Sequence, residues 1–419
     1  MFGKSCFRVV VAGMVLCAGG LGFRSVGAAE GVWLQWRGPE RTSQLTGVEW
    51  PDGIGEQQLV AGWEIPLEPS YSTPIVTEDR VFVTETVDKK EERVRALDRE
   101  TGEELWQVSW PGAITVPFFA MANGSWIRAT PIYDSGKLYV PGMKDYLICL
   151  DANTGDKMWD IDFVAHYDVS VPAFGCVCSP LIEGDYLYIQ AGSGFIKLNK
   201  LTGEPVWRVL TDKGGMEGAA FSSPVIAEIE GVQQLVVQTR TSLAGVSPES
   251  GDIYWTQEVP AFRGMNILTP LVVGDQVFTS TYGGKTWLYE VTKNGDAFQT
   301  NVVWEENQQG YMSSPVLIDD HIYLHMKNER FCCIDVKTGE RKWTTGAMGK
   351  YWSMVATGGK ILALNDRGNL YLIRANPEKF DVLDERTVSD DSTWAHLVVT
   401  GDDVFVRALS GLKKFSWKR

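Results

Sequence analysis

The sequence predicts an all-β fold, an eight-bladed β-propeller of four-stranded antiparallel blades that is closed by an N-terminal outer strand. Three observations predict it. A turn motif recurs along the chain, a Ser/Thr–Pro motif recurs in step with it, and a strand left over near the N-terminus matches one missing at the C-terminus. Repeats of roughly 40–50 residues in an all-β pattern are typical of blades arranged radially around an axis.

The first motif is a turn in which Asp, or a substitute, is followed by Thr or Ser, then Gly, then Trp four residues after the Gly. Its copies are Asp98–Gly102–Trp106, Asp151–Gly155–Trp159, Asn199–Gly203–Trp207, Ser247–Gly251–Trp255 and Asp335–Gly339–Trp343, with a looser copy at Val291–Gly295 and Trp304. The Asp side chain can accept hydrogen bonds from backbone amides two and three residues on, and Gly supplies a positive φ. We predict that these tryptophans, with Trp63, pack between neighbouring blades.

The second motif marks the innermost strand of each blade with a small residue followed by Pro. Its copies are Ser72–Thr73–Pro74, Ala129–Thr130–Pro131, Cys178–Ser179–Pro180, Ser222–Ser223–Pro224, Leu268–Thr269–Pro270 and Ser313–Ser314–Pro315, with degenerate copies at Trp352–Ser353–Met354 and Ala395–His396–Leu397. These starts predict eight blades. Seven blades is the alternative, if the degenerate copies merge.

The ends of the chain complement one another. The last copy has three recognisable strands, ending near Leu412–Trp417, and no outer strand. The segment Leu59–Pro66 reads as an outer strand without a blade, and its Trp63 occupies the position of the other repeat tryptophans. Pairing the two would remove the exposed sheet edges that favour aggregation.

Residues 1–29 read as a signal peptide, and residues 30–419 as a single propeller domain. Lys4 and Arg8 precede an apolar run over residues 9–22, and Gly27–Ala28–Ala29 offers small residues for cleavage. Cys17 leaves a lipoprotein start as the alternative. We therefore expect a periplasmic or secreted bacterial protein without a transmembrane span.

The charge balance argues against nucleic acid as a partner. Three of the 39 basic residues lie in the leader, so 36 basic residues remain against 53 acidic ones, a net charge of about −17. Such a surface repels nucleic acid and anionic lipid.

The paired motifs resemble a known repeat. The Ser/Thr–Pro starts and the run from Cys333 through Asp335 and Gly339 to Trp343 are similar to the quinoprotein-type (PQQ-like) propeller repeat. Quinoprotein alcohol dehydrogenases share this blade with BamB, the propeller lipoprotein of the outer-membrane barrel assembly machine. The opening run Trp33–Pro39 resembles the start of secreted, BamB-like bacterial propellers. The resemblance covers roughly residues 31–417 and implies fold and compartment, because the repeat residues are structural ones.

Residues just ahead of the Ser/Thr–Pro starts are expected to surround the mouth of the central channel. The candidates for contact with a ligand or partner are Trp126, Arg128, Glu217, Asn266, Tyr311, Trp352 and Trp394. Aromatic rings with a few polar groups suit a flat ligand, a sugar or a peptide. The alternative is that the rings plug the channel against one another.

These observations favour an exported, non-catalytic binding or scaffold module for a cell-envelope protein or a carbohydrate. No catalytic motif appears, and no catalytic, cofactor-binding or metal-binding residue is assigned. The alternative is a PQQ-dependent, quinoprotein dehydrogenase-like oxidoreductase with its cofactor and calcium in the channel. A third class, a carbohydrate-processing enzyme using Glu217, would require a second carboxylate at a suitable distance.

Overall fold

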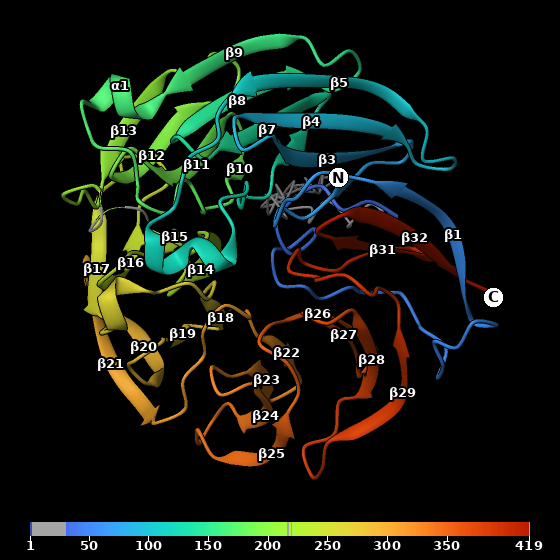
Figure 1. The fold of residues 1–419 in the computed structure, drawn as a ribbon. Coiled ribbons are helices and arrows are strands. Elements are labelled where there is room, and N and C mark those ends of the chain that lie inside the picture. Colours follow the sequence, from blue (N-terminus) through green and yellow to red (C-terminus); the bar gives the residue numbers. More distant parts are fainter. Residues whose placement is uncertain (2–30, 216–217, 219, 419) are drawn as a thin grey trace.

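The structure, a computed structural model, describes residue 1, residues 31–215, residue 218 and residues 220–418. The predicted signal peptide therefore lies outside the described residues, except for residue 1. Eight four-stranded antiparallel sheets surround a central axis, as Figure 1 shows. The predicted all-β, eight-bladed fold is confirmed.

In blades one to seven the strands follow the chain from the axis outward. The first four blades are β2 (Ile75–Val76), β3 (Arg80–Val87), β4 (Glu91–Asp98) and β5 (Glu104–Pro111); β6 (Ile132–Asp134), β7 (Lys137–Gly142), β8 (Tyr146–Asp151) and β9 (Lys157–Asp162); β10 (Leu181–Glu183), β11 (Tyr186–Ala191), β12 (Gly194–Asn199) and β13 (Pro205–Val209); and β14 (Val225–Ile229), β15 (Val232–Gln238), β16 (Ser242–Val246) and β17 (Ile253–Glu258).

The remaining blades follow the same order, except that the outer strand of blade eight comes from the N-terminal side. They are β18 (Leu271–Val273), β19 (Gln276–Ser280), β20 (Thr286–Asn294) and β21 (Ala297–Glu306); β22 (Val316–Ile318), β23 (His321–His325), β24 (Arg330–Asp335) and β25 (Arg341–Ala347); β26 (Trp352–Thr357), β27 (Lys360–Asn365), β28 (Asn369–Arg374) and β29 (Asp381–Thr387); and β30 (Val398–Thr400), β31 (Asp403–Ala408), β32 (Gly411–Trp417) and β1 (Leu59–Pro66). Three short helical segments join strands: α1 (Phe163–Tyr167), η1 (Phe118–Asn123) and η2 (Phe262–Gly264). No helix in the described part of the chain has the length and apolar character needed to cross a membrane.

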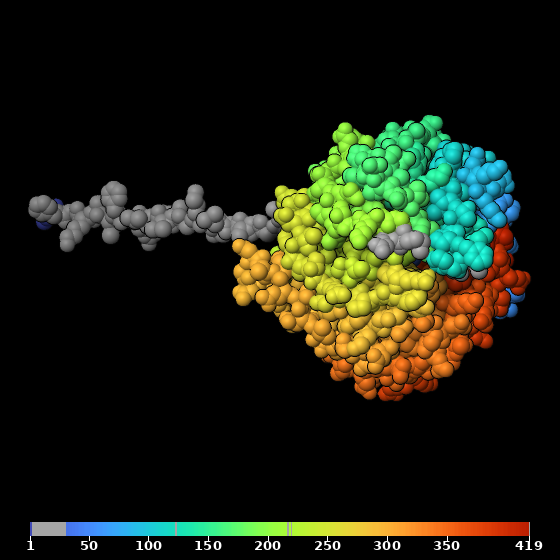
Figure 2. Space-filling model, turned by 60° about the vertical axis from the view of Figure 1, so that its left-hand side comes forward, coloured from blue at the N-terminus to red at the C-terminus, as the bar shows by residue number. Residues whose placement is uncertain are grey.

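The ring closes through the predicted N-terminal strand. β1 pairs antiparallel with β32, with Leu59 opposite Trp417 and Ile65 opposite Leu412. The degenerate copies form separate sheets, so the seven-blade alternative is wrong. In Figure 2 the blue surface of the first strands lies beside the red surface of the last blade.

The repeat tryptophans connect neighbouring blades. The indole N–H of Trp159 in β9 donates to the carbonyl of Lys200 in the next blade, at 3.1 Å. Trp63, Trp106, Trp207, Trp304 and Trp343 make the equivalent hydrogen bond to the following blade. Trp255 differs, because its indole N–H donates to Gln234 in its own blade. The hairpin of the following blade, β20–β21, is longer, so its turn lies farther out from the ring of blades than the turns that the other tryptophans meet.

Five of the six turn glycines receive the face of a tryptophan from the preceding blade, whereas Gly295 of the looser copy has nothing within 4 Å of an ideal Cβ. An ideal Cβ on Gly203, whose φ is +76°, would lie 2.5 Å from the Trp159 ring. The same relation joins Gly102 to Trp63, Gly155 to Trp106, Gly251 to Trp207 and Gly339 to Trp304. The motif therefore uses Gly twice, for the left-handed turn and for close approach of the indole.

Gly203→Ala is expected to destabilise the protein by about 2–4 kcal/mol, combining left-handed strain with overpacking against Trp159. Gly136→Ala is the matched control, because Gly136 has a φ of +80° and nothing within 4 Å of an ideal Cβ. The control variant should lose only the free energy that corresponds to the left-handed backbone strain, about 1–2 kcal/mol. Urea unfolding of both variants measures the difference, and equal destabilisation would contradict a role for the indole contact.

The hydroxyls of the Ser/Thr–Pro starts join neighbouring blades near the axis. The backbone N–H of Thr130 donates to the Ser179 hydroxyl, and that of Ser179 donates to the Ser223 hydroxyl, each at 2.9 Å. Equivalent bonds run from Thr73 to Thr130 and from Thr269 to Ser314. These hydroxyls satisfy backbone donors at the start of the neighbouring innermost strand, which explains why the motif prefers Ser and Thr.

Candidate functional site

The N-terminal segment, residues 33–45, enters the central channel and contacts all eight blades. Its ends pair with innermost strands: Trp33 with Val76 of blade one, and Gln44 with Ala356 of blade seven. Between them, the Leu34 carbonyl accepts from Tyr133 of blade two, and Ser43 lies 3.0 Å from the ring of His396 in blade eight. This segment, called the plug below, closes the channel on one side.

Two buried arginines hold the tip of the plug against the Ser/Thr–Pro starts. Arg41 donates from Nη1 to the Pro180 carbonyl at 2.7 Å, from Nη2 to Ser179 at 3.1 Å, and from Nε to Pro224 at 3.0 Å. Arg37 donates to the carbonyl of Pro315, and the Trp36 indole donates to Thr269 at 3.0 Å. Burial lowers the pKa of Arg41 to about 10 and that of Arg37 to about 9.

Above the plug lies a cavity of about 200 Å³ at the channel mouth. We call the face where the innermost strands begin the mouth face. The cavity is lined by Trp36, Tyr71, Ala120, Arg128, Phe174, Val177, Ser179, Phe221, Ser223, Met265, Ile267, Thr269, Tyr311, Met312, Tyr351 and Trp394. Trp36 comes from the plug, so the plug forms part of the cavity wall.

Arg128 is the one charged side chain among the described residues of this lining. Its Nη2 donates to the Gly124 carbonyl at 2.8 Å, and its guanidinium carbon lies 5.2 Å from the centre of the Tyr71 ring. Its Nε is buried without a hydrogen-bond partner. Burial lowers the pKa of Arg128, and burial raises that of Tyr71 to about 12.

Aromatic rings continue around the mouth from Arg128. Tyr71 contacts Trp126 edge-on at 5.2 Å between ring centres and Trp394 at 5.9 Å. Trp394 stacks on Tyr351 at 5.6 Å and 12°. Of the predicted contact residues, Arg128, Tyr311 and Trp394 thus line the cavity, and Trp126 packs directly behind Tyr71.

Two further predicted residues, Trp352 and Asn266, are not among the lining. Trp352 is fully buried inside blade seven, where it stacks on His325 and Tyr371. Asn266 is also fully buried, and its amide donates to three backbone carbonyls, those of Thr239, Arg240 and Val259. Their predicted place at the mouth is corrected, because their neighbours Tyr351 and Met265 face the cavity instead. Glu217 lies outside the described residues.

The sequence prediction missed the plug as part of the site. Trp36 and Phe221 line the cavity but were not among the candidates. The signal was present in the run Trp33–Pro39, which carries two tryptophans ahead of the first blade. Large aromatic residues of this kind rarely remain unpacked in a polar connecting segment.

Exposed apolar side chains lie beside the cavity on the mouth face. Phe118 and Phe119 in η1 are 89% and 60% exposed, and Phe262 in η2 is 48% exposed. Arg263 lies over both Phe119 and Phe262, at 5.5 and 5.2 Å from the ring centres, so the two segments adjoin. We call Phe118, Phe119, Met121 and Phe262 the aromatic rim. Figure 2 shows the cyan surface of η1 projecting beside the yellow surface of η2.

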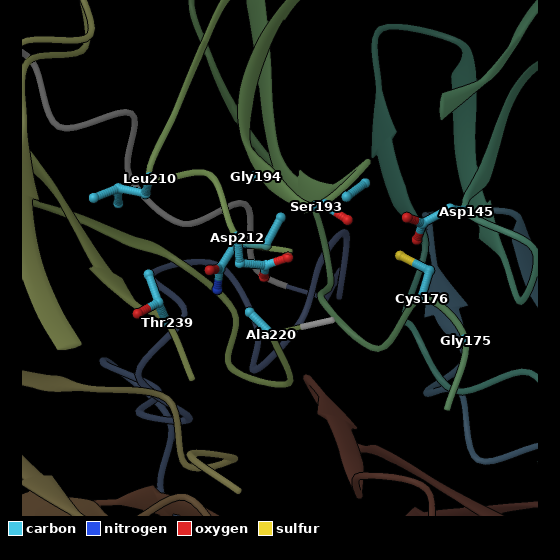
Figure 3. Close-up of a pocket in the computed structure, with 11 residues that line it drawn as sticks. Asp145, Gly175, Cys176, Ser193, Gly194, Leu210, Asp212, Ala220 and Thr239 are labelled. Atoms are coloured by element: carbon cyan, nitrogen blue, oxygen red, sulfur yellow. The ribbon is translucent and has the colours of Figure 1, made fainter. Parts of the chain in front are cut away.

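A second, much smaller cavity is lined by residues of blades two, three and four. Its volume of about 10 Å³ leaves space for roughly one water molecule. Figure 3 shows Asp145 beside Cys176 on one side, with Asp212 and Ser193 nearer the centre. Burial is the main cause that raises the pKa of Asp145 to about 7, with Asp212 and Asp162 adding to it.

The described residues contain no group of three or more His, Cys, Asp or Glu side chains arranged to hold a metal ion. Cys149, Cys176, Cys178, Cys332 and Cys333 are all free and buried. Burial raises the pKa of the Cys178 and Cys332 thiols to about 12. They therefore pack as small apolar residues.

The chain matches the protein family described as "Outer membrane protein assembly factor BamB" over residues 90–345. A relative of that name from Moranella endobia (strain PCIT) is 23% identical over 361 residues, which are 81% of this chain and 83% of that protein. The crystal structure of BamB from Moraxella catarrhalis is similar with a TM-score of 0.63 and 16% identity, covering 86% of this chain and 98% of that chain. Quinohemoprotein alcohol dehydrogenase from Comamonas testosteroni is similar with a TM-score of 0.67 and 13% identity, covering 93% and 81%. At these identities the structural matches establish the shared fold.

Proposed function

Because the chain belongs to the family described as outer membrane protein assembly factor BamB, we propose that it is a non-catalytic scaffold for outer membrane protein assembly in the cell envelope. The names of its relatives support this role. A ring closed by β1 and crossed by the plug presents its surface in one geometry, so a partner docks at little cost in ordering the scaffold.

The observation that carries the proposal is the aromatic rim. Four large apolar side chains stand exposed on one face of an otherwise strongly acidic protein. Contiguous exposed apolar surface marks protein contacts, and aromatic residues dominate the energy of such contacts. The rim is therefore the proposed contact for an envelope protein.

The test compares cells lacking the gene with cells that carry the native chain or the Phe118→Ser/Phe119→Ser variant. We expect folded outer-membrane β-barrel proteins to decrease without the gene, to recover with the native chain, and to remain low with the double variant. Heat-modifiable gel mobility of the barrel proteins measures the folded fraction. Barrel levels that do not change when the gene is removed would refute the assembly role.

Leu201→Ser is the matched control for the rim variant. The exposed fraction of Leu201, 55%, is similar to the 60% of Phe119. Leu201, however, lies in the turn after β12, the third strand of its blade. Because antiparallel strands alternate in direction, that turn is on the face opposite the mouth. The control is expected to restore barrel levels, and an equal defect in both variants would remove the rim from the proposal.

The alternative, a dehydrogenase using PQQ and calcium, is not favoured by the residues present. Calcium prefers several oxygen ligands, chiefly carboxylates, and the described lining of the cavity offers no carboxylate side chain. The adjacent pair Cys332–Cys333 lies in β24, the third strand of blade six, and neither lines the cavity. The absence of a cofactor remains a prediction.

A further inference from the structure

The cavity at the channel mouth has the size of a small aromatic molecule. An apolar protein cavity of about 150 Å³ accommodates benzene. The present cavity of about 200 Å³ therefore has space for one aromatic ring and a short polar group. A larger fused-ring molecule would have to extend beyond it.

The walls of the cavity favour an aromatic ring. Seven of its lining side chains are aromatic: Trp36, Tyr71, Phe174, Phe221, Tyr311, Tyr351 and Trp394. Trp394 and Tyr351 are already parallel, 5.6 Å apart, and Tyr71 is tilted against Trp394. Offset-stacked and edge-on contacts with such rings stabilise a bound ring beyond the area that it buries.

The serine and threonine hydroxyls of the cavity wall already have partners. The hydroxyls of Ser179 and Ser223 accept from the backbone of the preceding blade, and that of Thr269 accepts from Trp36. These groups hold the ring of blades and the plug together. They supply little specificity for a ligand.

Arg128 is the group that selects the ligand's charge. A guanidinium has five N–H donors, and the structure shows one of the five bonded, to Gly124. The described lining of the cavity holds no carboxylate, and the Nε of Arg128 is buried without a hydrogen-bond partner. Leaving the buried Nε donor without a partner is costly, and a planar carboxylate matches the guanidinium fork.

We propose that this cavity is a binding site for a molecule that combines one aromatic ring with one carboxylate, the ring held among Tyr71, Tyr351 and Trp394 and the carboxylate by Arg128. Two sources supply this chemistry: a free aromatic acid, and the C-terminal aromatic residue of a peptide. The site is separate from the rim, so its failure would leave the assembly role standing.

Calorimetric titration of the purified protein tests the site. The probes are 3-phenylpropionate and its amide, and acetyl-Gly-Gly-Phe with a free or an amidated C-terminus. We expect at least one free acid to bind at least about tenfold more tightly than its amide, a factor that corresponds to about 1.4 kcal/mol. Tighter binding of the peptide acid identifies a chain terminus as the source, and tighter binding of phenylpropionate identifies a free acid.

Arg128→Gln is expected to abolish the difference between acid and amide, and Arg128→Lys is expected to keep part of it. Arg367→Gln is the control, because Arg367 is exposed in the turn between β27 and β28, on the mouth face but outside the cavity lining. It is expected to bind like the native protein. The acid–amide comparison in the native protein does not depend on any variant folding. Equal binding of acids and amides, no binding of any probe, or unchanged binding by Arg128→Gln would overturn the proposal.

Discussion

Replacing Arg41 with Met is expected to lower the free energy of unfolding by about 3 kcal/mol, because three buried carbonyls lose a charged donor. Those of Ser179, Pro180 and Pro224 belong to blades three and four, and each accepts from the Arg41 guanidinium. Relief from burying the charge, which already lowers the pKa of Arg41 to about 10, offsets part of the loss.

Two further variants identify the cause. Arg41→Lys keeps the charge, but one ammonium lacks the fork that reaches both blades, so an intermediate loss is expected. Arg330→Met is the control, because Arg330 is exposed and donates to one carbonyl, that of Thr345 in its own blade. Urea unfolding measures all three. If Arg41→Met stayed within about 0.5 kcal/mol of the native protein, the plug would not be an energetic link between blades.

The protein is expected to lose stability as the pH rises from about 4 to about 7. Burial is the main cause that raises the pKa of Glu92 from 4.5 to about 7 and that of Asp145 from 3.8 to about 7. The folded protein keeps these protons up to about pH 7, whereas the unfolded chain releases them near pH 4. Their contribution is therefore fully present below about pH 4 and is lost by the time the pH passes about 7, on the order of 3 kcal/mol for each group.

Both carboxyls join neighbouring blades, which explains their burial. Glu92 in β4 accepts from the Met143 backbone at 2.7 Å and from the Trp110 indole at 3.0 Å. Asp145, between β7 and β8, accepts from Gly192 of the next blade at 2.7 Å. Carboxyls with a lowered pKa, such as Asp98, change the free energy of unfolding only below about pH 4. They therefore do not alter the slope of stability between about pH 4 and 7.

Asp145→Asn tests the assignment, because Asn keeps an acceptor for Gly192 and cannot ionise. We expect the variant to be more stable than the native protein at about pH 8 and to show a smaller loss between about pH 4 and 7. Asp98→Asn, a change that the third copy of the turn carries naturally at Asn199, is expected to leave the slope in this interval unaltered. Urea midpoints across this range measure both. A native slope in Asp145→Asn would contradict the prediction.

The fold could be predicted because each repeat carries its own local instructions. Asp98 turns the chain by accepting from Glu100 and Thr101, and Gly102 provides the left-handed residue within the same few positions. Such contacts depend on neighbours in sequence, so the residue pattern reveals them. The last repeat lacked an outer strand, so the strand Leu59–Pro66 could be expected to pair with the open edge of that blade, and it does pair with β32.

The candidate site was predicted less completely, because adjacent residues differ in the side to which they point. Tyr351 lines the cavity whereas Trp352 is buried among His325 and Tyr371. Met265 and Asn266 divide in the same way. Motif spacing indicates that a pair lies near the mouth, but the local path of the backbone decides which member faces it.

By itself, then, the sequence determined the all-β class, the eight blades and the closure of the ring, since these follow from a period and from turn chemistry within a few residues. Only the tertiary structure showed how the plug, residues 33–45, fills the central channel. Arg41 meets its acceptors 138 to 183 residues away, and Ser43 meets His396 across 353 residues. Contacts at such separations leave no local pattern, because they exist only once the blades have closed around the plug.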